Sequence, residues 1–274
     1  MTALQRWSQG LAGWGIPEEI LAAAPESPWG FPAEPFRVRA ERAAAREPTA
    51  STRRALEALP EGGSVLDVGV GGGAACLPLA GRASLLVGVD TSDDMLATFA
   101  DGARARGVRA LPVQGSWPES ASRAPETDIA VCHHVLYNVP DLEPFVRALD
   151  GQARRRVVIE ITATHPLSWM SELWRGFHGL ERPSGPTADD AFEVLGELAL
   201  GANREDERRT PLSSGFERRE DAVALVRRRL CLPAGRDAEV VRALGPLLIQ
   251  RDGLWTAGPA DQLLVTLWWE TATR

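Results

Sequence analysis

The stretch that decides the fold is VLDVGVGGGA, residues 65–74. An apolar run ends near Asp67, and glycines follow at positions 69, 71, 72 and 73. Glycine permits backbone conformations that a side chain forbids, and it lets a ligand approach backbone N–H groups closely. Such a turn between a strand and a helix is typical of a nucleotide-like cofactor site, so we expect a cofactor to bind here.

Apolar runs and helix-compatible stretches alternate on the carboxyl side of this turn. Buried strands separated by helices favour a parallel sheet that helices cover on both faces. The sequence therefore predicts a doubly wound α/β fold. We expect helices at 74–81, 94–106 and 142–149 and strands at 64–69, 84–90, 109–114, 128–132, 157–162 and 263–270.

The rest of the chain divides around this alternation. Prolines and tryptophans break the first part into short pieces, which predicts a helical cap or arm over residues 1–59. We expect residues 60–274 to form one Rossmann-like domain with a helical insertion at approximately 165–202. The segments 182–189 and 203–215 are predicted to be loops or insertions.

Composition limits the classes of function. The 274 residues are 44% hydrophobic and carry a net charge of −7, which is typical of a soluble globular protein and disfavours nucleic acid as a partner. The three cysteines form no C-x-x-C, and the four histidines show no metal-ligand spacing, so we expect neither disulfides nor a metal. We find no apolar stretch of the ~18 residues that cross a bilayer and no secretory signal, and we expect a cytoplasmic protein.

Two motifs around the glycine turn resemble those of the class I, Rossmann-like S-adenosylmethionine-dependent methyltransferases. The first is Asp67-Val-Gly69-Val-Gly71-Gly-Gly73, where that family has an acidic residue before G-x-G-x-G. The second is GVDTSDDML at 88–96, in which Asp90 matches the family residue that holds both ribose hydroxyls.

Two further motifs follow in the family's order. LPVQGSWP at 111–118 is similar to the third motif, although Ser116 stands where the family commonly has an acidic residue that contacts adenine. TDIAVCHHVLYNVPD at 127–141 is similar to the fourth. The resemblance covers about residues 60–162.

The resemblance implies a fold, a cofactor and a set of site residues. It implies a seven-stranded, mostly parallel sheet with an antiparallel final strand, a helical cap before it and a helical insertion after strand five. It implies S-adenosylmethionine as the methyl donor. The implied cofactor-binding residues are Asp67, Gly69, Gly71, Gly73, Asp90, Thr91, Met95, Gly115, Ser116, Trp117, Cys132 and His133.

His133 and His134 are the candidate catalytic residues. They follow strand four, where substrate and methyl group meet in the resembling family, and an imidazole there can accept a proton from an O–H or N–H group. A histidine pair at a strand end can also be a packed pair without a chemical role. Methyl transfer depends heavily on positioning, so a dedicated base is not required.

The predicted function is methyl transfer to an O, N or C nucleophile of a small-molecule acceptor. We expect Trp7, Trp14, Trp29, Trp169 and Trp174 to contribute to an aromatic lid over the acceptor, with some of them in the core instead. The sequence does not fix the oligomeric state, and a homodimer is one option.

Two other functions stay open. An NAD(P)-dependent oxidoreductase is favoured by Gly69, Gly71 and Ala74, which satisfy the relaxed G-x-G-x-x-A pattern with Asp90 about 20 residues further on. The order of the later motifs and the absence of any lysine for a Tyr-x-x-x-Lys pair argue against it. The third reading is a non-catalytic protein that binds S-adenosylmethionine or a partner.

Overall fold

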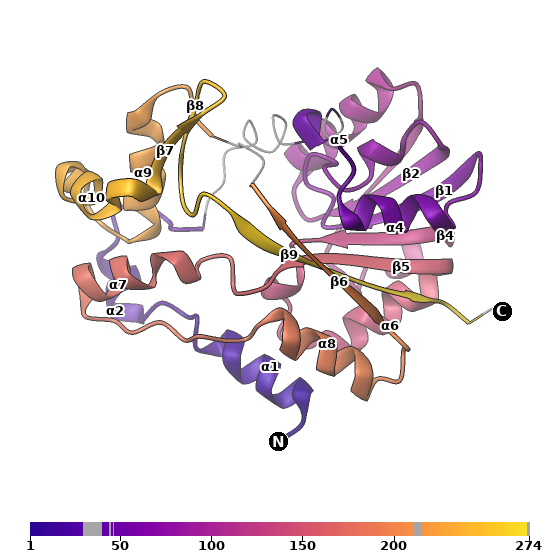
Figure 1. The fold of residues 1–274 in the computed structure, drawn as a ribbon, viewed down its shortest axis with the longest axis horizontal. Helices are drawn as coiled ribbons and strands as arrows, with labels where there is room; N and C mark the ends of the chain where they lie inside the picture. The colour runs from indigo at the N-terminus through magenta and orange to yellow at the C-terminus, as the bar shows by residue number, and fades with distance from the viewer. Residues whose placement is uncertain (30–39, 44, 46, 211–214, 273–274) are drawn as a thin grey trace.

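A seven-stranded sheet forms the centre of the computed structural model, which describes residues 1–29, 40–43, 45, 47–210 and 215–272 (Figure 1). The strand order is β3-β2-β1-β4-β5-β9-β6, and β9 runs antiparallel to both of its neighbours while the strands from β3 to β5 are parallel. The predicted fold class is thereby confirmed. The strands are β1 (Gly63–Val68), β2 (Ala83–Asp90), β3 (Arg109–Gln114), β4 (Thr127–His133), β5 (Ala153–Thr162), β6 (Asn203–Arg209) and β9 (Gln262–Glu270).

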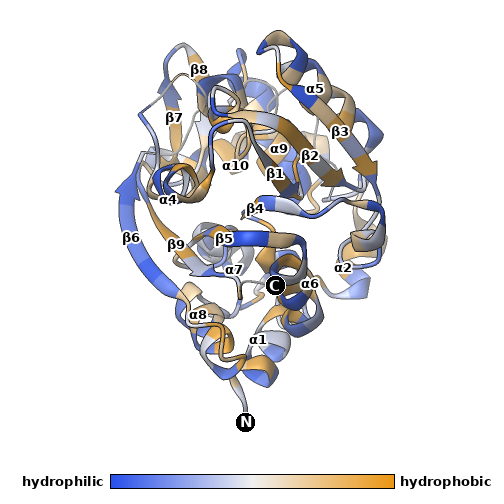
Figure 2. Ribbon diagram, turned by 90° about the vertical axis from the view of Figure 1, so that its right-hand side faces the viewer, coloured by the Kyte–Doolittle hydropathy of each residue, from blue (hydrophilic) through white to orange (hydrophobic). Residues whose placement is uncertain are grey.

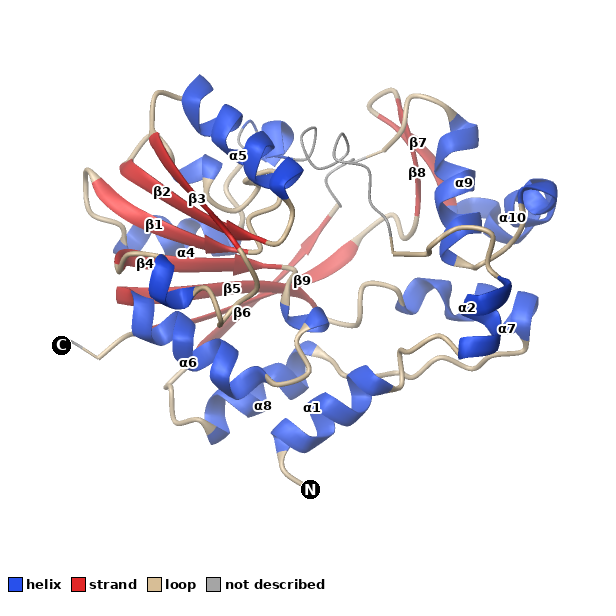
Figure 3. Ribbon diagram, turned by 180° about the vertical axis from the view of Figure 1, so that it is seen from behind, coloured by secondary structure: helices blue, strands red, loops and turns tan. Residues whose placement is uncertain are grey.

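Helices cover both faces of this sheet because its strands are apolar on both sides (Figure 3). Val65, Ile129 and Val158 face a core under helices α4 and α5, whereas their neighbours Leu66, Ala130 and Val157 face α1, α6 and α8. The helices are α1 (Ala3–Ala12), α4 (Ala50–Ala58), α5 (Asp93–Ala105), α6 (Leu142–Gln152) and α8 (Ala188–Glu197).

A second lobe with its own apolar core lies beside the sheet (Figures 1 and 3). Three separate parts of the chain build it: residues 16–24 of the amino-terminal arm, the segment after β5, and the segment between β6 and β9. The last of these also forms a β-hairpin, which we did not expect from the sequence. The elements are α2 (Glu18–Ala23), α7 (Ser171–His178), α9 (Arg219–Arg229), α10 (Asp237–Leu244), β7 (Leu248–Arg251) and β8 (Leu254–Ala257).

The helix predicted at 74–81 is wrong. The chain there makes a series of turns and one short 3-10 helix, Leu77–Leu79. Pro78 explains the difference, since proline has no N–H to donate and its ring clashes with the preceding turn of an α-helix. The glycine turn is therefore not followed directly by an α-helix.

The loop predicted at 203–215 is also wrong in its first half, because Asn203–Arg209 is strand β6. The sequence NREDERR has no apolar residue, so hydropathy gives no sign of a strand, and Figure 2 shows β6 as hydrophilic along its length. It lies at the sheet edge, where charged side chains are common because they oppose pairing with other chains. Residues 211–214 lie outside the described part.

The amino-terminal arm is fixed to the sheet by its tryptophans. The Trp7 indole is fully buried, donates a hydrogen bond of 2.8 Å to the carbonyl of Val139, and stacks on Tyr137. Trp14 stacks on His165 at 3.8 Å between ring centroids. Residues 30–39 of the predicted arm 1–59 lie outside the described part. Among the described residues, no helix is both long and apolar enough to cross a bilayer.

Replacing Trp7 with alanine should lower the free energy of unfolding by about 3–5 kcal/mol, because the change empties a buried site and removes a hydrogen bond. Trp29→Ala is the matched control, since Trp29 is 51% exposed and its loss should change stability by less than about 0.5 kcal/mol. Urea denaturation measures both. Equal stability of the two variants would contradict the docking of the arm.

Candidate active site

The glycine turn is a tight backbone loop at the carboxyl end of β1. Gly69, Gly71 and Gly73 have φ angles of +72°, +50° and +89°, a region that disfavours other residues. A Cβ on Gly69 would lie 2.3 Å from Cγ2 of Val135. The loop therefore needs glycine for its own conformation and for its close approach to the segment after β4.

Asp90 holds this loop to the next strand. Its Oδ2 accepts a hydrogen bond of 2.9 Å from the N–H of Gly71, and its Oδ1 accepts one of 3.0 Å from the N–H of Ser92. The backbone carbonyl of Asp90 accepts from the N–H of Gly115, at the end of β3. The first, second and third motifs thus meet at Asp90. Each carboxylate oxygen has two acceptor positions, so both can take a further hydrogen bond.

Asp67 lies beneath the loop and is 1% exposed. Neither of its carboxyl oxygens has hydrogen-bond geometry to any described residue, although the Cys76 thiol and backbone lie close enough to favour the charged form. Burial, with a smaller contribution from the charge of Asp90, raises the pKa of Asp67 to about 7. The carboxyl group is therefore shielded from solvent.

A second buried carboxylate joins the two candidate histidines. Glu160 on β5 is paired in register with His133, and its Oε1 lies 3.8 Å from Nδ1 of His133 and 3.3 Å from Nε2 of His134. Its Oε2 accepts a hydrogen bond of 2.6 Å from Ser51 Oγ. Burial opposes ionisation, but the charge of His133 and the hydrogen bonds of His134 and Ser51 outweigh it and hold the pKa of Glu160 below its usual range.

These polar groups share one face and one edge of the sheet. Side chains two residues apart on a strand point to the same face. Asp67, His133 and Glu160 each follow, by two residues, a strand residue of the core under α4 and α5. Asp90 follows Leu86 of that core by four residues. The ends of β1, β2, β4 and β5 therefore carry a row of polar side chains on the α4 side.

The other predicted residues lie around this row in different settings. Thr91 is exposed and Met95 half-buried where α5 begins, next to Asp90. Ser116 is exposed beyond β3, whereas the Trp117 indole donates to the carbonyl of Phe145 on α6. The Cys132 side chain is fully buried in the core on the opposite face of the sheet, so it does not point toward the row.

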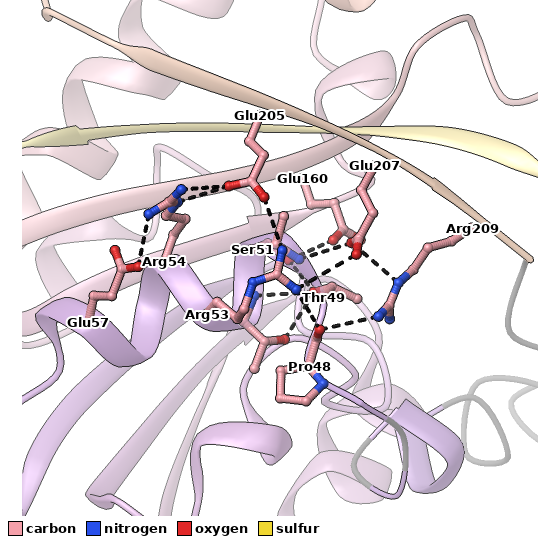
Figure 4. A network of polar contacts seen from close by, with 12 residues as sticks. Pro48, Thr49, Ser51, Arg53, Arg54, Glu57, Glu160, Glu205, Glu207 and Arg209 are labelled. Atoms are coloured by element: carbon pink, nitrogen blue, oxygen red, sulfur yellow. Dashed lines mark hydrogen bonds and ion pairs between the residues drawn. The ribbon is translucent and has the colours of Figure 1, made fainter.

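Sequence analysis missed Glu160 and Ser51 as site residues. Glu160 left a signal, because it is the single charged residue in the apolar run VVIEIT at 157–162. Ser51 left none, since its partner is 109 residues away. Figure 4 shows why Ser51 reaches Glu160: the start of α4 is fastened to β6 by Glu205 and Glu207, which bind Arg53, Arg54 and the N–H of Ala50.

A cavity of about 530 Å³ lies beyond the end of β5. Its walls come from the segment after β5, the β7–β8 hairpin and the start of β9, and include Trp169, Arg251 and Thr256. Thr162, two residues after Glu160 on the same face, also lines it. Of the five tryptophans of the predicted lid, Trp169 lines this cavity, Trp7, Trp14 and Trp174 are buried, and Trp29 is exposed.

Comparison with known proteins agrees with this geometry. A family model described as a methyltransferase domain matches residues 65–154, which contain the glycine loop, Asp90 and the end of β4. The match covers about a third of the chain and confirms the resemblance of this segment to the methyltransferases. A search of curated proteins finds no match.

Two solved structures share the fold of most of this chain. A cyclopropane-fatty-acyl-phospholipid synthase-like protein from Lactobacillus casei is 13% identical, with a TM-score of 0.53 over 92% of this chain and 98% of that one. A putative methyltransferase from Bacillus halodurans is 14% identical, with a TM-score of 0.51 over 82% of this chain and 99% of that one. At this identity the likeness concerns the fold alone.

The raised pKa of Asp67 predicts how stability depends on pH. The native state keeps the proton up to about pH 7, whereas the unfolded chain loses it near the ordinary value of 3.8, so the native state binds more protons between these values. Stability contributed by protonated Asp67 is full below about pH 4 and is lost as pH rises through 7. The unfolding free energy should fall by a few kcal/mol across this pH range.

The Asp67→Asn variant should lack this loss. Urea denaturation between pH 4.5 and 8 would show it as a flatter decline of the unfolding free energy than in the wild type. Asp93→Asn, an exposed carboxylate on α5, is the control and should keep the wild-type decline. A wild-type decline in Asp67→Asn would show that Asp67 is ionised throughout this range.

Proposed function

We propose that the protein is an S-adenosylmethionine-dependent methyltransferase acting on a small molecule. The observation that carries the proposal is the junction at Asp90, where a carboxylate at the end of β2 holds a loop of glycines with positive φ. A nucleoside needs such an arrangement, because the carboxylate accepts from the ribose hydroxyls while the loop lets the ligand come close to the backbone.

The residues present fit this cofactor. Asp90 would accept hydrogen bonds from the ribose, the loop from Gly69 to Gly73 would line the methionine part, and Gly115 and Ser116 would flank the adenine. Asp67, at the buried end of β1 just before the loop, would add negative charge on the side of the cofactor's amino group once it ionises above about pH 7. The bound cofactor would supply a methyl group activated by a positively charged sulfur.

The topology favours this proposal over a nicotinamide-dependent oxidoreductase. The dinucleotide-binding fold has the strand order 3-2-1-4-5-6 without an antiparallel strand among its last members. Here the antiparallel β9 lies between β5 and β6. The relaxed G-x-G-x-x-A pattern is present, but Ala74 lies in a turn and not in the α-helix that this fingerprint opens.

The cavity beyond β5 is the proposed acceptor site. Its volume of about 530 Å³ is in the usual range for small-molecule pockets, and Trp169 and Ile249 give it apolar wall area beside the polar Thr256 and Arg251. The net charge of −7 argues against nucleic acid as the acceptor. A cytoplasmic location, a catalytically active protein rather than a cofactor-binding one, and a homodimer as one possible assembly stay predictions.

Asp90→Asn tests the cofactor site. The change keeps the volume of the side chain but removes its charge and puts an NH₂ donor where one acceptor was, against the N–H of Gly71 or Ser92. Hydrogen bonds to a charged group contribute about 1.5–3 kcal/mol, so affinity for S-adenosylmethionine should fall roughly 10- to 100-fold. Isothermal titration calorimetry measures the dissociation constant.

Asp93→Asn serves as the matched control for this measurement. Asp93 is an exposed carboxylate three residues further along, in the first turn of α5, and it makes no contact with the glycine loop among the contacts described above. It should bind S-adenosylmethionine with nearly wild-type affinity. Full affinity in a folded Asp90→Asn protein would remove Asp90 from the cofactor site.

A further inference from the structure

Glu160 is a buried charge that cofactor binding does not require. It lies on β5, two strands from β1, and is 5% exposed. Burying a carboxylate is unfavourable by several kcal/mol unless it is paired and hydrogen-bonded. Its partners come from two separate elements: Ser51 on α4 and the histidine pair at the end of β4.

The backbone of His134 is strained in a way that serves this contact. Its φ is +60°, in the left-handed region that favours glycine over residues with a side chain. In this conformation the backbone N–H of His134 donates a hydrogen bond of 2.7 Å to the backbone carbonyl of Glu160. Nε2 of the His134 ring also lies 3.3 Å from the carboxylate of Glu160. Main chain and side chain of His134 are thus both held by Glu160.

The contact with Glu160 favours one tautomer of His134. Nε2 lies 3.3 Å from Oε1 of Glu160, so a proton on Nε2 faces the carboxylate and leaves the lone pair of the ring on Nδ1, the atom that would accept a proton. Of the two histidines, His134 is nearer to Glu160 and its side chain is more exposed, at 23% against 13% for His133. His134 is therefore the better placed of the two to meet a substrate.

The strands beside His134 and the start of α4 carry further titratable and charged groups. Glu160 lies on β5 in direct contact, and His133 is the neighbour on β4. Asp67 on β1 is buried next to β4. Glu207 on β6 accepts from the N–H of Ala50 at the start of α4 and is itself paired with Arg53 and Arg209 (Figure 4). Among the residues that the structure describes, the Glu160 carboxylate lies 3.3 Å from the His134 ring.

We propose that Glu160 is a positioning residue that orients His134 and strengthens it as the general base of methyl transfer. This rests on the proposed function and narrows its substrate class to acceptors whose nucleophile is an O–H or N–H group that must lose a proton. Acceptors methylated on a thioether sulfur or other atom without a proton would not need it.

The imidazole Nδ1 would take the proton of the acceptor's O–H or N–H, and the freed electron pair would form the new bond to the methyl carbon. Bound S-adenosylmethionine would supply that methyl group, and the electron pair of its carbon–sulfur bond would stay on sulfur, which would become neutral. The imidazolium is stabilised by the Glu160 carboxylate and later loses its proton to solvent. The acceptor would reach His134 from the side of the cavity at Thr162, two residues beyond Glu160.

Nitrogen NMR of the histidine side chains tests the proposal without a known acceptor. The chain has four histidines, so single His→Gln variants assign every resonance. In the wild type, His134 should titrate above the ordinary value of about 6.5 and, when neutral, carry its proton on Nε2. A proton on Nδ1, or a midpoint below the ordinary value, overturns the proposal with no variant needed.

Glu160→Gln gives the direct comparison. Loss of an opposite charge at this distance should lower the His134 midpoint by about one pH unit or more. Glu207→Gln is the matched control, because Glu207 binds the same end of α4 without contacting a histidine in any contact described above, and it should shift the midpoint by much less. Equal shifts in the two variants would overturn the role of Glu160.

Failure of this inference and failure of the proposed function give different results. A protein that binds S-adenosylmethionine but shows an ordinary His134 titration keeps the proposed function and loses this inference. A protein that does not bind S-adenosylmethionine loses both.

Discussion

The burial of the parallel sheet on both faces is the constraint on which the rest of the structure depends. Strands such as β1, β4 and β5 have helices on either side, so their side chains must be apolar except where a strand ends. On the α4 side, each of the strands β1, β2, β4 and β5 has a polar residue at its carboxyl end. The packing that stabilises the sheet therefore also determines where the polar side chains of the candidate site lie.

Two buried carboxylates in this row show that neighbouring donors and charges determine whether the pKa of a buried carboxyl group rises or falls. No donor in the described part of the chain has good hydrogen-bond geometry to Asp67, and its pKa rises to about 7. Glu160 is almost as buried, but a hydroxyl and two imidazoles face it, and its pKa falls. In the proposed function the two ends of the row have separate tasks, with β1 and β2 binding the cofactor and β4 and β5 handling the proton.

The edge strand β6 links these tasks to the amino-terminal part of the chain. Its glutamates fasten the start of α4, and α4 delivers Ser51 to Glu160. Each exposed ion pair of this kind contributes little by itself, typically below about 1 kcal/mol. The network matters here because it fixes the position of the start of α4. The hydrogen bond from the Ser51 hydroxyl to Glu160 depends on that position.

Local sequence was sufficient for the parts that depend on local chemistry. Glycines predicted the loop at Gly69, and an apolar run ending in an acidic residue predicted Asp90 and the strand before it. Pro78 could have ruled out the helix at 74–81, and it was overlooked because the flanking residues favour a helix. Strand β6 and the Ser51–Glu160 hydrogen bond were out of reach, since a charged strand has no hydropathy signal and the contact spans 109 residues. The second lobe was missed as a unit because three distant segments build its core.

The central claim is that the row at the carboxyl edge binds S-adenosylmethionine. A thermal-shift comparison of S-adenosylmethionine, S-adenosylhomocysteine, NAD and NADP on the wild-type protein tests it most directly, because a ligand at 100 times its dissociation constant stabilises the native state by about 2.7 kcal/mol. The account predicts a rise in melting temperature with the two adenosyl sulfur compounds and none with the nicotinamide dinucleotides. A rise with NAD or NADP alone would contradict it.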